Sequence, residues 1–492
     1  MKNKFYITTT IPYSNAEPHI GFALEIVQAD VLARWHSILG ENVFFLTGTD
    51  EHGSKNYQTA KKEGISPQKF VDRNSKKFKE LTKVLNISNN YFIRTTDKKK
   101  HWPGVIKIWK ILEKNGDIYK KKYEGNYCSG CERFITDKEL IDGKCQDHPN
   151  IEIKNISEEN YFFRLSKYSD KIRELVKKDR LLIVPEKWKN DFLGLIKNGL
   201  TDVSFSREKK HLPWGVPIPG DKDQTMYVWG DALNNYLTGI GYPDIKYKKY
   251  WPADVHLVGK DMLRFHAGIW PGMLLSINLP LPKKIAVHGF IVVGGQKMSK
   301  SLGNIVAPLK LAKEYPIDAI RYYLIRHIPF GDDGDFSEQK LKNSLNNELA
   351  NDLGNLLSRT LTLCEKYFNG KLKKQKDDGL FKKLKIVKVK KYFDSYELHN
   401  ALSEIWNFVR ESNKYVNKNE PWKNEKNRDV VLYNLLESLR IISILIQPFI
   451  PETSEKICKQ LGVKLGSIKD VKFGIVSNYN VKKGDILFKK LK

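Results

Sequence analysis

The sequence contains no long hydrophobic run. Its longest strongly apolar stretch, residues 441–446, ends at Gln447 and Pro448 and is far shorter than the roughly 20 residues that a membrane-spanning helix needs. The N-terminus passes almost at once into residues 5–10, which are typical of a β-strand, without the apolar region of a signal peptide. We therefore expect neither a membrane anchor nor a secretion signal.

Cysteine is scarce, with five in 492 residues. A small, odd number does not form a disulfide framework and favours a reducing compartment, so we expect a cytoplasmic protein. Three of the five form a Cys-x-x-Cys and a Cys-x-x-His pair: Cys128, Cys131, Cys145 and His148. Three thiolates and one imidazole satisfy tetrahedral Zn²⁺ and leave no open position, which predicts a structural zinc site. The alternative is a coincidental cluster of buried thiols.

Acidic residues are outnumbered, with 57 Asp and Glu against 84 Lys and Arg and a formal net charge of +27. Such an excess favours a polyanionic partner such as nucleic acid. Lysine is abundant throughout the chain, however, as a biased codon usage would also produce, so charge alone leaves the partner open. The length allows several domains and a large core.

No internal repeat divides the chain, but its pattern changes along its length. Alternating strands and helices predict an α/β fold, a Rossmann-type doubly wound parallel sheet, with its first half in residues 1–114 and its second in residues 214–293. An inserted connective segment, residues 115–213, carries the cysteine cluster. After a basic loop and its surroundings, residues 294–336, long helical patterns predict an all-α bundle in residues 337–492.

Individual elements follow from local signals. Apolar residues at helical spacing predict a helix over residues 23–39, which Gly40 ends. Ser66 and Pro67 are typical of the cap and first residue of another helix. Further strands are predicted at residues 42–47, 255–258 and 285–290, and further helices at residues 337–367, 380–417 and 429–446.

Two short segments suit a polyphosphate ligand. Residues 297–301, Lys-Met-Ser-Lys-Ser, offer lysine charge and serine hydrogen bonds on a loop. Residues 18–22, Pro-His-Ile-Gly-Phe, lie where a strand feeds a helix N-terminus, whose backbone N–H groups favour phosphate. Gly21 allows a ligand to approach the backbone closely. Alone, each segment would suit a solvated loop or a capped helix; together they indicate a nucleotide site.

These segments, in this order, resemble the HIGH and KMSKS motifs of class I aminoacyl-tRNA synthetases. Stretches along nearly the whole chain resemble the methionyl-tRNA synthetase family of that class: IPYSN at 11–15, TGTDEHG at 47–53, FIRTTD at 92–97, YVWGDAL at 227–233, VGKD at 258–261 and EPW at 420–422. The resemblance implies a methionine–tRNA ligase that converts methionine and ATP to methionyl-adenylate and charges tRNA(Met). It also implies Mg²⁺ with ATP and zinc knuckles in the insertion, and we expect a monomer.

The resemblance further implies which residues meet ATP. The catalytic residues would be His19, Lys297 and Lys300. The ATP-binding residues would be His19, Gly21, Phe22, His288, Gly289, Lys297, Met298, Ser299 and Lys300. No protein nucleophile is needed, since the methionine carboxylate attacks, so catalysis would rest on positioning and charge stabilisation.

Phe22 departs from the family motif, which has a second histidine at this position. Phenylalanine cannot donate a hydrogen bond, and losing a charge-assisted one costs about 1.5–3 kcal/mol, or roughly one to two decades in rate. Because His19, Gly21 and the basic loop remain, we expect a working enzyme with an altered ATP site. A non-catalytic tRNA-binding paralogue is the alternative.

The methionine pocket implied by the resemblance comprises Ile11, Tyr13, Asp50, Trp229, Ala232, Leu233, Tyr236, Phe265, His266 and Trp270. Aromatic and apolar walls suit a thioether, and Asp50 would pair with the substrate ammonium. Trp229, Phe265 and Trp270 would equally suit an ordinary core.

The family's anticodon-reading residues correspond to Asn351, Asn355, Arg359 and Trp422. The first three are spaced four apart, which predicts one shared helix face. Amides and a guanidinium read base edges, and an indole stacks on an unpaired base. A solvated helix surface is the alternative for the two asparagines. A synthetase for Ile, Val or Leu is a further alternative, but it would carry a larger editing insertion than residues 115–213 allow.

Overall fold

A six-stranded parallel sheet forms the centre of the catalytic half. The computed structural model describes residues 3–128, 133–135, 140–146, 149–298 and 303–491. The strand order is β3-β2-β1-β14-β15-β9, with parallel pairing throughout. The strands are β1 (Lys4–Thr9), β2 (Asn42–Thr49), β3 (Tyr91–Arg94), β9 (Leu182–Val184), β14 (Val255–Gly259) and β15 (Lys284–His288). The predicted parallel sheet is therefore confirmed.

β1 lies at the switch point of this sheet. Its Ile7 is opposite Phe45 of β2 on one side and Val255 of β14 on the other. After β1 the chain first forms β2 and β3 on one side of it, and later forms β9, β14 and β15 on the other side. In such sheets a crevice opens outside the carboxyl ends of the two central strands, and ligands bind there.

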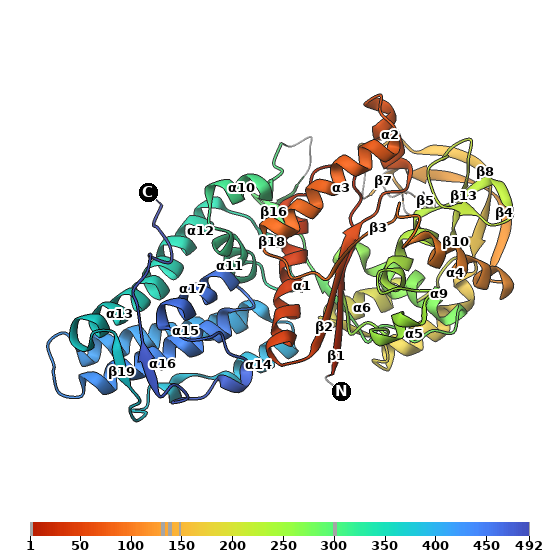
Figure 1. The fold of residues 1–492 in the computed structure, drawn as a ribbon. Helices are drawn as coiled ribbons and strands as arrows, with labels where there is room; N and C mark the ends of the chain where they lie inside the picture. Colours follow the sequence, from red (N-terminus) through yellow and green to blue (C-terminus); the bar gives the residue numbers. More distant parts are fainter. Residues whose placement is uncertain (1–2, 129–132, 136–139, 147–148, 299–302, 492) are drawn as a thin grey trace.

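Helices flank the sheet and fill its connections (Figure 1). The helix predicted directly after β1 is confirmed as α1 (Ile20–Ile38), and the chain turns away at Gly40, whose φ is 89°. Ser66 caps the next predicted helix, because its hydroxyl accepts from the backbone N–H of Lys69. The helices of this half are α1, α2 (Ser54–Lys62), α3 (Pro67–Val84), α4 (Trp102–Lys114), α5 (Ser169–Lys177), α6 (Glu186–Leu195), α7 (Val228–Asp231), α8 (Asn235–Thr238) and α9 (Trp270–Ser276).

The described strands of residues 115–213, predicted as an insertion, belong to four sheets. The largest of these is an antiparallel sheet of order β10-β8-β4-β5, made of β4 (Ile118–Cys128), β5 (Arg133–Ile135), β8 (Lys154–Phe163) and β10 (Val203–Ser204). β9 instead pairs with β15 and is an edge strand of the central sheet. Part of the segment is thus built into the catalytic sheet, a pairing over about a hundred residues that local patterns do not reveal.

The remaining strands make small sheets. β11 (Ser206–Glu208), β13 (Asp221–Met226) and β12 (Pro217–Ile218) form one, and β17 (Gln296–Lys297), β16 (Ile291–Val293) and β18 (Gly334–Asp335) form another. Two-stranded pairs join β6 (Leu140–Ile141) to β7 (Lys144–Cys145) and β19 (Lys371–Lys373) to β20 (Asn478–Asn480).

The C-terminal part is helical, as predicted, but two of its helices are interrupted. The helix expected over residues 337–367 consists of α12 (Glu338–Asn343), a π-helical stretch η7 (Ser344–Gly354) and α13 (Asn355–Phe368). The one expected over residues 380–417 breaks at Tyr396, with φ of 64°, into α14 (Ile386–Asp394) and α15 (Leu398–Asn419). The others are α10 (Pro308–Glu314), α11 (Ile317–His327), α16 (Arg428–Ile446) and α17 (Pro451–Leu461).

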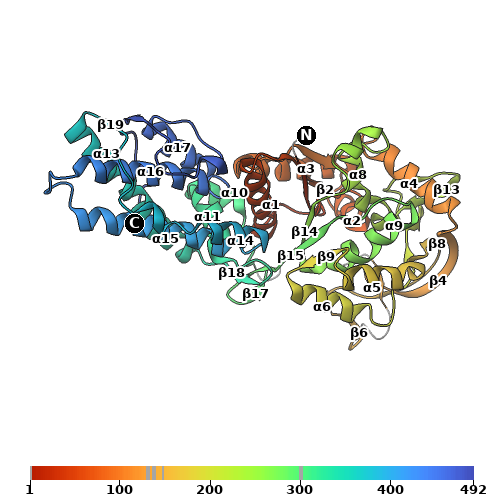
Figure 2. The same ribbon diagram turned by 90° about the horizontal axis from the view of Figure 1, so that it is seen from below.

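α1 lies between the sheet and the helical bundle (Figure 2). One continuous cluster of buried apolar residues runs from α1 through α11, α13, α15 and α16. At the junction the rings of Trp35 on α1 and Phe393 on α14 stack with centroids 3.9 Å apart. The helix that begins at the expected phosphate site is therefore packed directly against the bundle. Across the residues described above, no helix combines the length and apolarity needed to cross a membrane.

Candidate active site

A cavity of about 400 Å³ opens at the carboxyl ends of β1 and β14. Its wall is formed by the loop after β1, the start of α1, the end of β2, the α7–α8 segment, the turn after β14 and the chain from β15 to β17. Predicted residues that line it are Ile11, Tyr13, His19, Gly21, Phe22, Asp50, Trp229, Ala232, Leu233, Tyr236, His266, His288, Gly289, Lys297 and Met298. Segments far apart in the sequence thus meet at one crevice.

His19 caps α1 at one end of the cavity. Its Nδ1 accepts from the backbone N–H of Gly21 at 3.0 Å, which leaves the proton on Nε2. Although the ring opens to the cavity, the protein around it lowers its pKa by desolvation, opposed by the charge of Asp261. A Cβ at position 21 would lie 2.8 Å from the His19 ring, so glycine is needed for this capping geometry. The result is a neutral N–H donor beside a helix N-terminus.

Lys297 and Met298 approach the same end of the cavity from β17 and the residue after it. The Lys297 side chain is exposed, and its ammonium lies over the Phe290 ring at 4.8 Å. Ser299 and Lys300, the other predicted residues of this loop, lie outside the described residues.

Glu25, which sequence reasoning missed, links α1 to His288. Its Oε2 is 2.9 Å from Nε2 of His288, and its Oε1 accepts from the backbone N–H and hydroxyl of Thr10 at 2.7 and 2.5 Å. Burial alone would lower the pKa of His288, but Glu25 and the Gly289 carbonyl face its two nitrogens and raise it. The sequence does mark Glu25 in one way, because it is a single acidic residue among the apolar residues at the start of a predicted helix.

Aromatic side chains form the opposite end. Trp229 of α7 stacks on Phe265 at 3.8 Å, with an interplanar angle of 11°. Phe265 and the fully buried Trp270 are not among the residues lining the cavity; they support its wall from behind. Phe265 and His266 belong to a π-helical stretch, η6 (Phe265–Ile269), ahead of α9. Direct contact of Phe265 and Trp270 with a ligand stays a prediction.

Two buried histidines, His266 in this wall and His256, each carry their proton on a ring nitrogen that their hydrogen bonds identify. His266 donates from Nδ1 to the Met262 carbonyl at 2.9 Å, so its Nε2 accepts from the Tyr236 hydroxyl at 2.6 Å. His256 accepts at Nε2 from the Trp270 indole at 3.2 Å. Desolvation lowers the pKa of His266 to about 4 and that of His256 well below its usual range. This end of the cavity is therefore lined by neutral groups.

Asp50 provides a carboxylate between the two ends. It is 5% exposed and lines the cavity. Its backbone pairs with the loop after β1, where it donates to the Pro12 carbonyl at 2.9 Å and accepts from the Ser14 N–H at 3.1 Å. The pairing holds Asp50 and Tyr13 side by side.

Comparison with known proteins identifies the architecture. The family model of class I tRNA synthetases (M) matches residues 5–156 and 149–361, and that of the anticodon-binding domain of tRNA ligases matches residues 383–482. Methionine–tRNA ligase of Caldanaerobacter subterraneus is 47% identical over all of this chain and 79% of its own length. That of Brucella suis is 42% identical over 94% of this chain and 92% of its own. The chain belongs to the methionyl-tRNA synthetase family.

A solved structure of the family agrees over the whole chain. Mycobacterium tuberculosis methionyl-tRNA synthetase in complex with methionyl-adenylate superimposes with a TM-score of 0.94 at 38% identity, covering 99% of this chain and all of that one. The predicted family, the class I fold with its helical anticodon-binding domain, and the methionine–tRNA ligase activity are confirmed. The roles of individual residues stay predictions.

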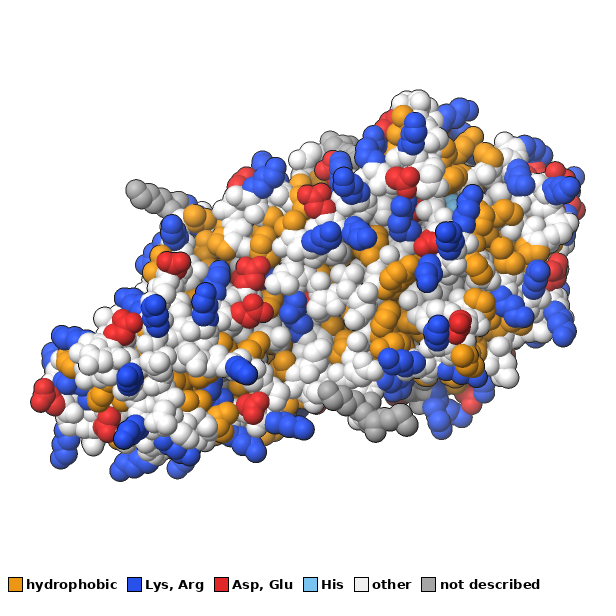
Figure 3. Space-filling model, in the orientation of Figure 1, with side chains coloured by type: hydrophobic (Ala, Val, Ile, Leu, Met, Phe, Trp, Pro, Cys, Tyr) orange, Lys and Arg blue, Asp and Glu red, His pale blue; other side chains and the backbone are white. Residues whose placement is uncertain are grey.

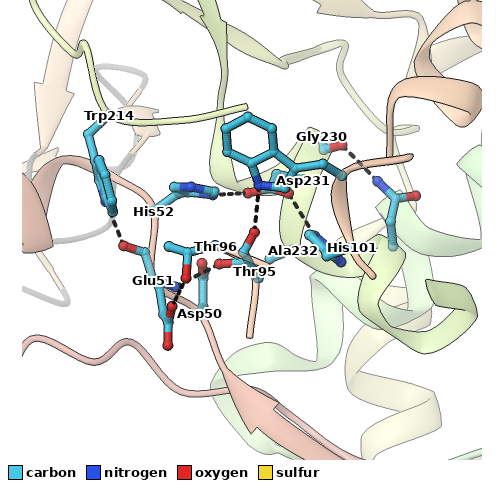
Figure 4. A network of polar contacts seen from close by, with 12 residues as sticks. Asp50, Glu51, His52, Thr95, Thr96, His101, Trp214, Gly230, Asp231 and Ala232 are labelled. Atoms are coloured by element: carbon cyan, nitrogen blue, oxygen red, sulfur yellow. Dashed lines mark hydrogen bonds and ion pairs between the residues drawn. The ribbon is translucent and has the colours of Figure 1, made fainter. Parts of the chain in front are cut away.

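A buried polar network, which sequence reasoning also missed, braces the methionyl-tRNA synthetase cavity (Figure 4). Asp231, between Gly230 and the wall residue Ala232, meets His52 Nδ1 at 2.6 Å and His101 Nε2 at 2.8 Å. Burial would raise the pKa of Asp231, but the two histidines outweigh it and hold it at about 2. The carboxylate thus joins the segment of Trp229 to the loop that follows Asp50. Asp231 and His52 lie within the family-like stretches and His101 does not, and no spacing pattern marks the three as a cluster.

Glu51 anchors the other side of this network. It accepts from Arg94 Nε at 2.6 Å and from the Thr49 hydroxyl at 2.8 Å, while the Trp214 indole donates to its backbone carbonyl at 2.7 Å. The contacts of Glu51 and His52, the two residues after Asp50, therefore hold this loop in place.

The four predicted anticodon residues lie in the helical part, away from the cavity. Asn351 is in the π-helical stretch η7, and Asn355 and Arg359 are in α13. The Arg359 guanidinium lies 5.3 Å from the centroid of the Trp422 ring, which is 36% exposed. Asn351 therefore lies in a π-helical stretch and not in the regular α-helix that the pattern predicted, and the shared face of the three side chains stays a prediction.

The predicted zinc ligands are only partly within the described residues. Cys128, at the end of β4, and Cys145, at the end of β7, are buried in one small cluster with Ile135. Cys131 and His148 lie outside the described residues. Among those that the structure describes, no three histidine, cysteine or acidic side chains group together as a metal site.

The positive charge is not confined to one stripe. In Figure 3 Lys and Arg side chains are scattered over the visible face from the catalytic half to the bundle, with fewer Asp and Glu side chains between them. This distribution suits a polyanion that touches both ends of the protein.

Proposed function

We propose that this single cavity joins methionine to ATP and then passes the methionyl group to tRNA(Met). The observation that carries the proposal is that one crevice unites the expected phosphate end, with His19 and Lys297, and the expected methionine end, with Asp50 and Trp229. The methionyl-adenylate bound to the M. tuberculosis relative supports the same assignment.

In the first step the methionine carboxylate attacks the α-phosphorus, and the bond to the bridging oxygen breaks to release pyrophosphate. His19 donates its Nε2–H to a phosphate oxygen, and the α1 N-terminus favours the developing charge. Lys297 and Lys300 hold the outer phosphates. Mg²⁺ bound with ATP supplies further neutralisation. His288 and Gly289 border the nucleotide.

Methionine is selected by an uncharged, aromatic pocket. The thioether packs against Trp229, Leu233 and Ile11, since sulfur interacts favourably with rings. His266 and Tyr236 close the pocket with hydrogen bonds that are already satisfied by each other. Asp50 pairs with the ammonium group.

The bundle reads the anticodon. Asn351, Asn355 and Arg359 offer donors and acceptors to base edges, and Trp422 offers a stacking surface. The match of residues 383–482 to an anticodon-binding domain supports this role for the Trp422 loop. A cytoplasmic location and a monomeric state stay predictions.

A structural Zn²⁺ held by Cys128, Cys131, Cys145 and His148 completes the assignment. The two described thiols share one buried cluster, as two knuckles around a common ion require. The ion would stabilise the segment and take no part in the reaction.

Methionine-dependent ATP–pyrophosphate exchange tests the proposal. The wild type should exchange label, His19→Ala should lose at least two decades of rate, and Asp50→Asn should mainly raise the KM for methionine. Tyr433→Phe, in the bundle, is the control and should behave as wild type. A wild-type exchange rate in His19→Ala would contradict the phosphate role proposed for His19.

A further inference from the structure

The loop that carries Trp422 is short and tightly turned. It joins α15 to α16, and Glu420 and Asn427 at its two ends adopt left-handed conformations, with φ of 41° and 62°. Trp422 is exposed at its centre. An exposed aromatic ring on a connection of this kind needs support from outside the loop if it is to keep one orientation.

Two side chains hold consecutive carbonyl groups of this loop. Arg428, the first residue of α16, donates from Nε to the Pro421 carbonyl at 2.7 Å. Tyr367, near the end of α13, donates from its hydroxyl to the Trp422 carbonyl at 3.2 Å. The Arg428 guanidinium lies 3.7 Å from the centroid of the Tyr367 ring. Arg428 and Tyr367 therefore also contact each other.

The same helix presents the group that faces the indole. Arg359 precedes Tyr367 by eight residues on α13, and its guanidinium lies over the Trp422 ring while Nη2 donates to Asn417 at 2.8 Å. α13 thus contacts Trp422 twice, at its ring through Arg359 and at its backbone through Tyr367. The orientation of the indole relative to the predicted base-reading residues is set by one rigid element.

We propose that Tyr367 and Arg428 are positioning residues for anticodon recognition, which hold the Trp422 indole in its stacking orientation before tRNA binds. The proposal rests on the anticodon role of Trp422 given above. Ordering the loop in advance removes an entropic cost from tRNA binding. Arg428 does not need to touch the nucleic acid, and its side chain is only 12% exposed.

Arg428 and Tyr367 each make contacts that a similar residue would make only in part. Lysine at position 428 would keep the charge, but a single ammonium cannot lie flat on a ring and donate sideways to a carbonyl as a planar guanidinium does. Phenylalanine at position 367 would keep the ring under Arg428 and lose only the hydroxyl. The two substitutions therefore remove the two carbonyl contacts separately.

The experiment compares tRNA charging with amino-acid activation in the full chain. Tyr367→Phe and Arg428→Lys should each raise the KM for tRNA(Met) about three- to tenfold, as loss of one hydrogen bond predicts. The kcat and methionine-dependent pyrophosphate exchange should stay unchanged. Tyr433→Phe is the matched control, because it removes a hydroxyl that donates to the Val476 carbonyl at 2.7 Å in the same bundle; it should leave the KM for tRNA unchanged.

The Trp422→Ala background separates positioning from a direct role. There, Tyr367→Phe should add almost nothing, since the ring it orients is gone. Full additivity would overturn the proposal, as would normal KM values for both single variants. Arg428→Gln should leave the salt dependence of tRNA binding unchanged; a slope smaller by about one would make Arg428 a phosphate ligand instead. If Trp422→Ala itself charges tRNA normally, the anticodon role of the loop fails and this proposal fails with it.

Discussion

Phe22 places an aromatic ring where the family motif has a histidine. It is 6% exposed, lines the cavity and meets Phe78 edge-on at 5.1 Å. Phe22→His should restore a donor near the phosphates and lower the KM for ATP or raise kcat by up to roughly tenfold. The KM for methionine should hardly change, because that end of the cavity is built from other segments. Exchange kinetics at varied ATP and methionine measure both effects.

The opposite result would be equally informative. A drop in activity in Phe22→His would show that the site has adapted to the Phe22–Phe78 contact and that no donor is missing.

His266 should make stability depend on pH. Its pKa is about 4 in the folded protein because of desolvation, against 6.5 when exposed. Between these values the unfolded chain takes up a proton that the folded chain does not, so stability is full above pH 6.5 and falls toward pH 4, by on the order of 2–3 kcal/mol. Urea unfolding at several pH values should show a shallower decline for His266→Gln. An identical decline would assign the effect to other groups, His256 among them.

The buried carboxylate of Asp231 holds α7 in position. Asp231 connects this helix to His52 and His101 behind the methionine end of the cavity. Asp231→Asn should leave one of these contacts poorly satisfied and loosen the wall at Trp229, raising the KM for methionine by about tenfold. The KM for ATP should change much less. Asp170→Asn, at an exposed ion pair with Arg173, should match the wild type, and equal losses for both substrates would show general unfolding instead.

The β4 and β7 strands end in the two described cysteines of the predicted zinc site. The purified protein should carry about one tightly bound Zn²⁺ per chain. Cys145→Ala should lose the metal and destabilise the segment around it. Cys364→Ala is the control, since this thiol is buried in α13, far along the chain, where burial raises its pKa to about 12. Elemental analysis that finds no metal in the wild type would reject the site.

One guanidinium joins the catalytic half to the bundle. Arg321 of α11 is fully buried and donates to Asp30 of α1 at 2.7 Å, to the Leu85 carbonyl at 2.9 Å, and to the carbonyls of Pro448 and Phe449 at 3.0 and 2.9 Å. Burial would raise the pKa of Asp30, but Arg321 and Arg34 lower it. Each contact joins α11 to a segment that is distant in the sequence: α1, the end of α3, and the turn between α16 and α17.

Removing this group should therefore affect the whole fold. Arg321→Met leaves the buried Asp30 charge with Arg34 as its remaining ion pair and removes the donors of three carbonyl groups, and should lower the free energy of unfolding by about 3–5 kcal/mol. Asp30→Asn combined with it should cost less than the sum of the two, because the pair interacts directly. Arg73→Met, at an exposed pair with Glu63, should change stability by less than about 1 kcal/mol. Urea unfolding that shows equal effects for Arg321 and Arg73 would contradict this role.

Much of the fold followed from patterns within single segments. The start and end of α1, the Ser66 cap and four strands of the central sheet, β1, β2, β14 and β15, are decided by neighbouring residues, since caps, turns and apolar periodicity act over a few positions. The HIGH-like and KMSKS segments and the Trp422 loop were identifiable for the same reason, because each carries its chemistry in a short run.

Contacts across the chain were decided only by the tertiary structure. It paired β9 with β15, placed Glu25 against His288, gathered His52 and His101 around Asp231, and set Phe265 and Trp270 behind the cavity wall. It also turned residues 344–354 into a π-helix where the pattern predicted an α-helix. Such features depend on which distant surfaces pack together and on which buried polar groups find partners, and no local propensity encodes either.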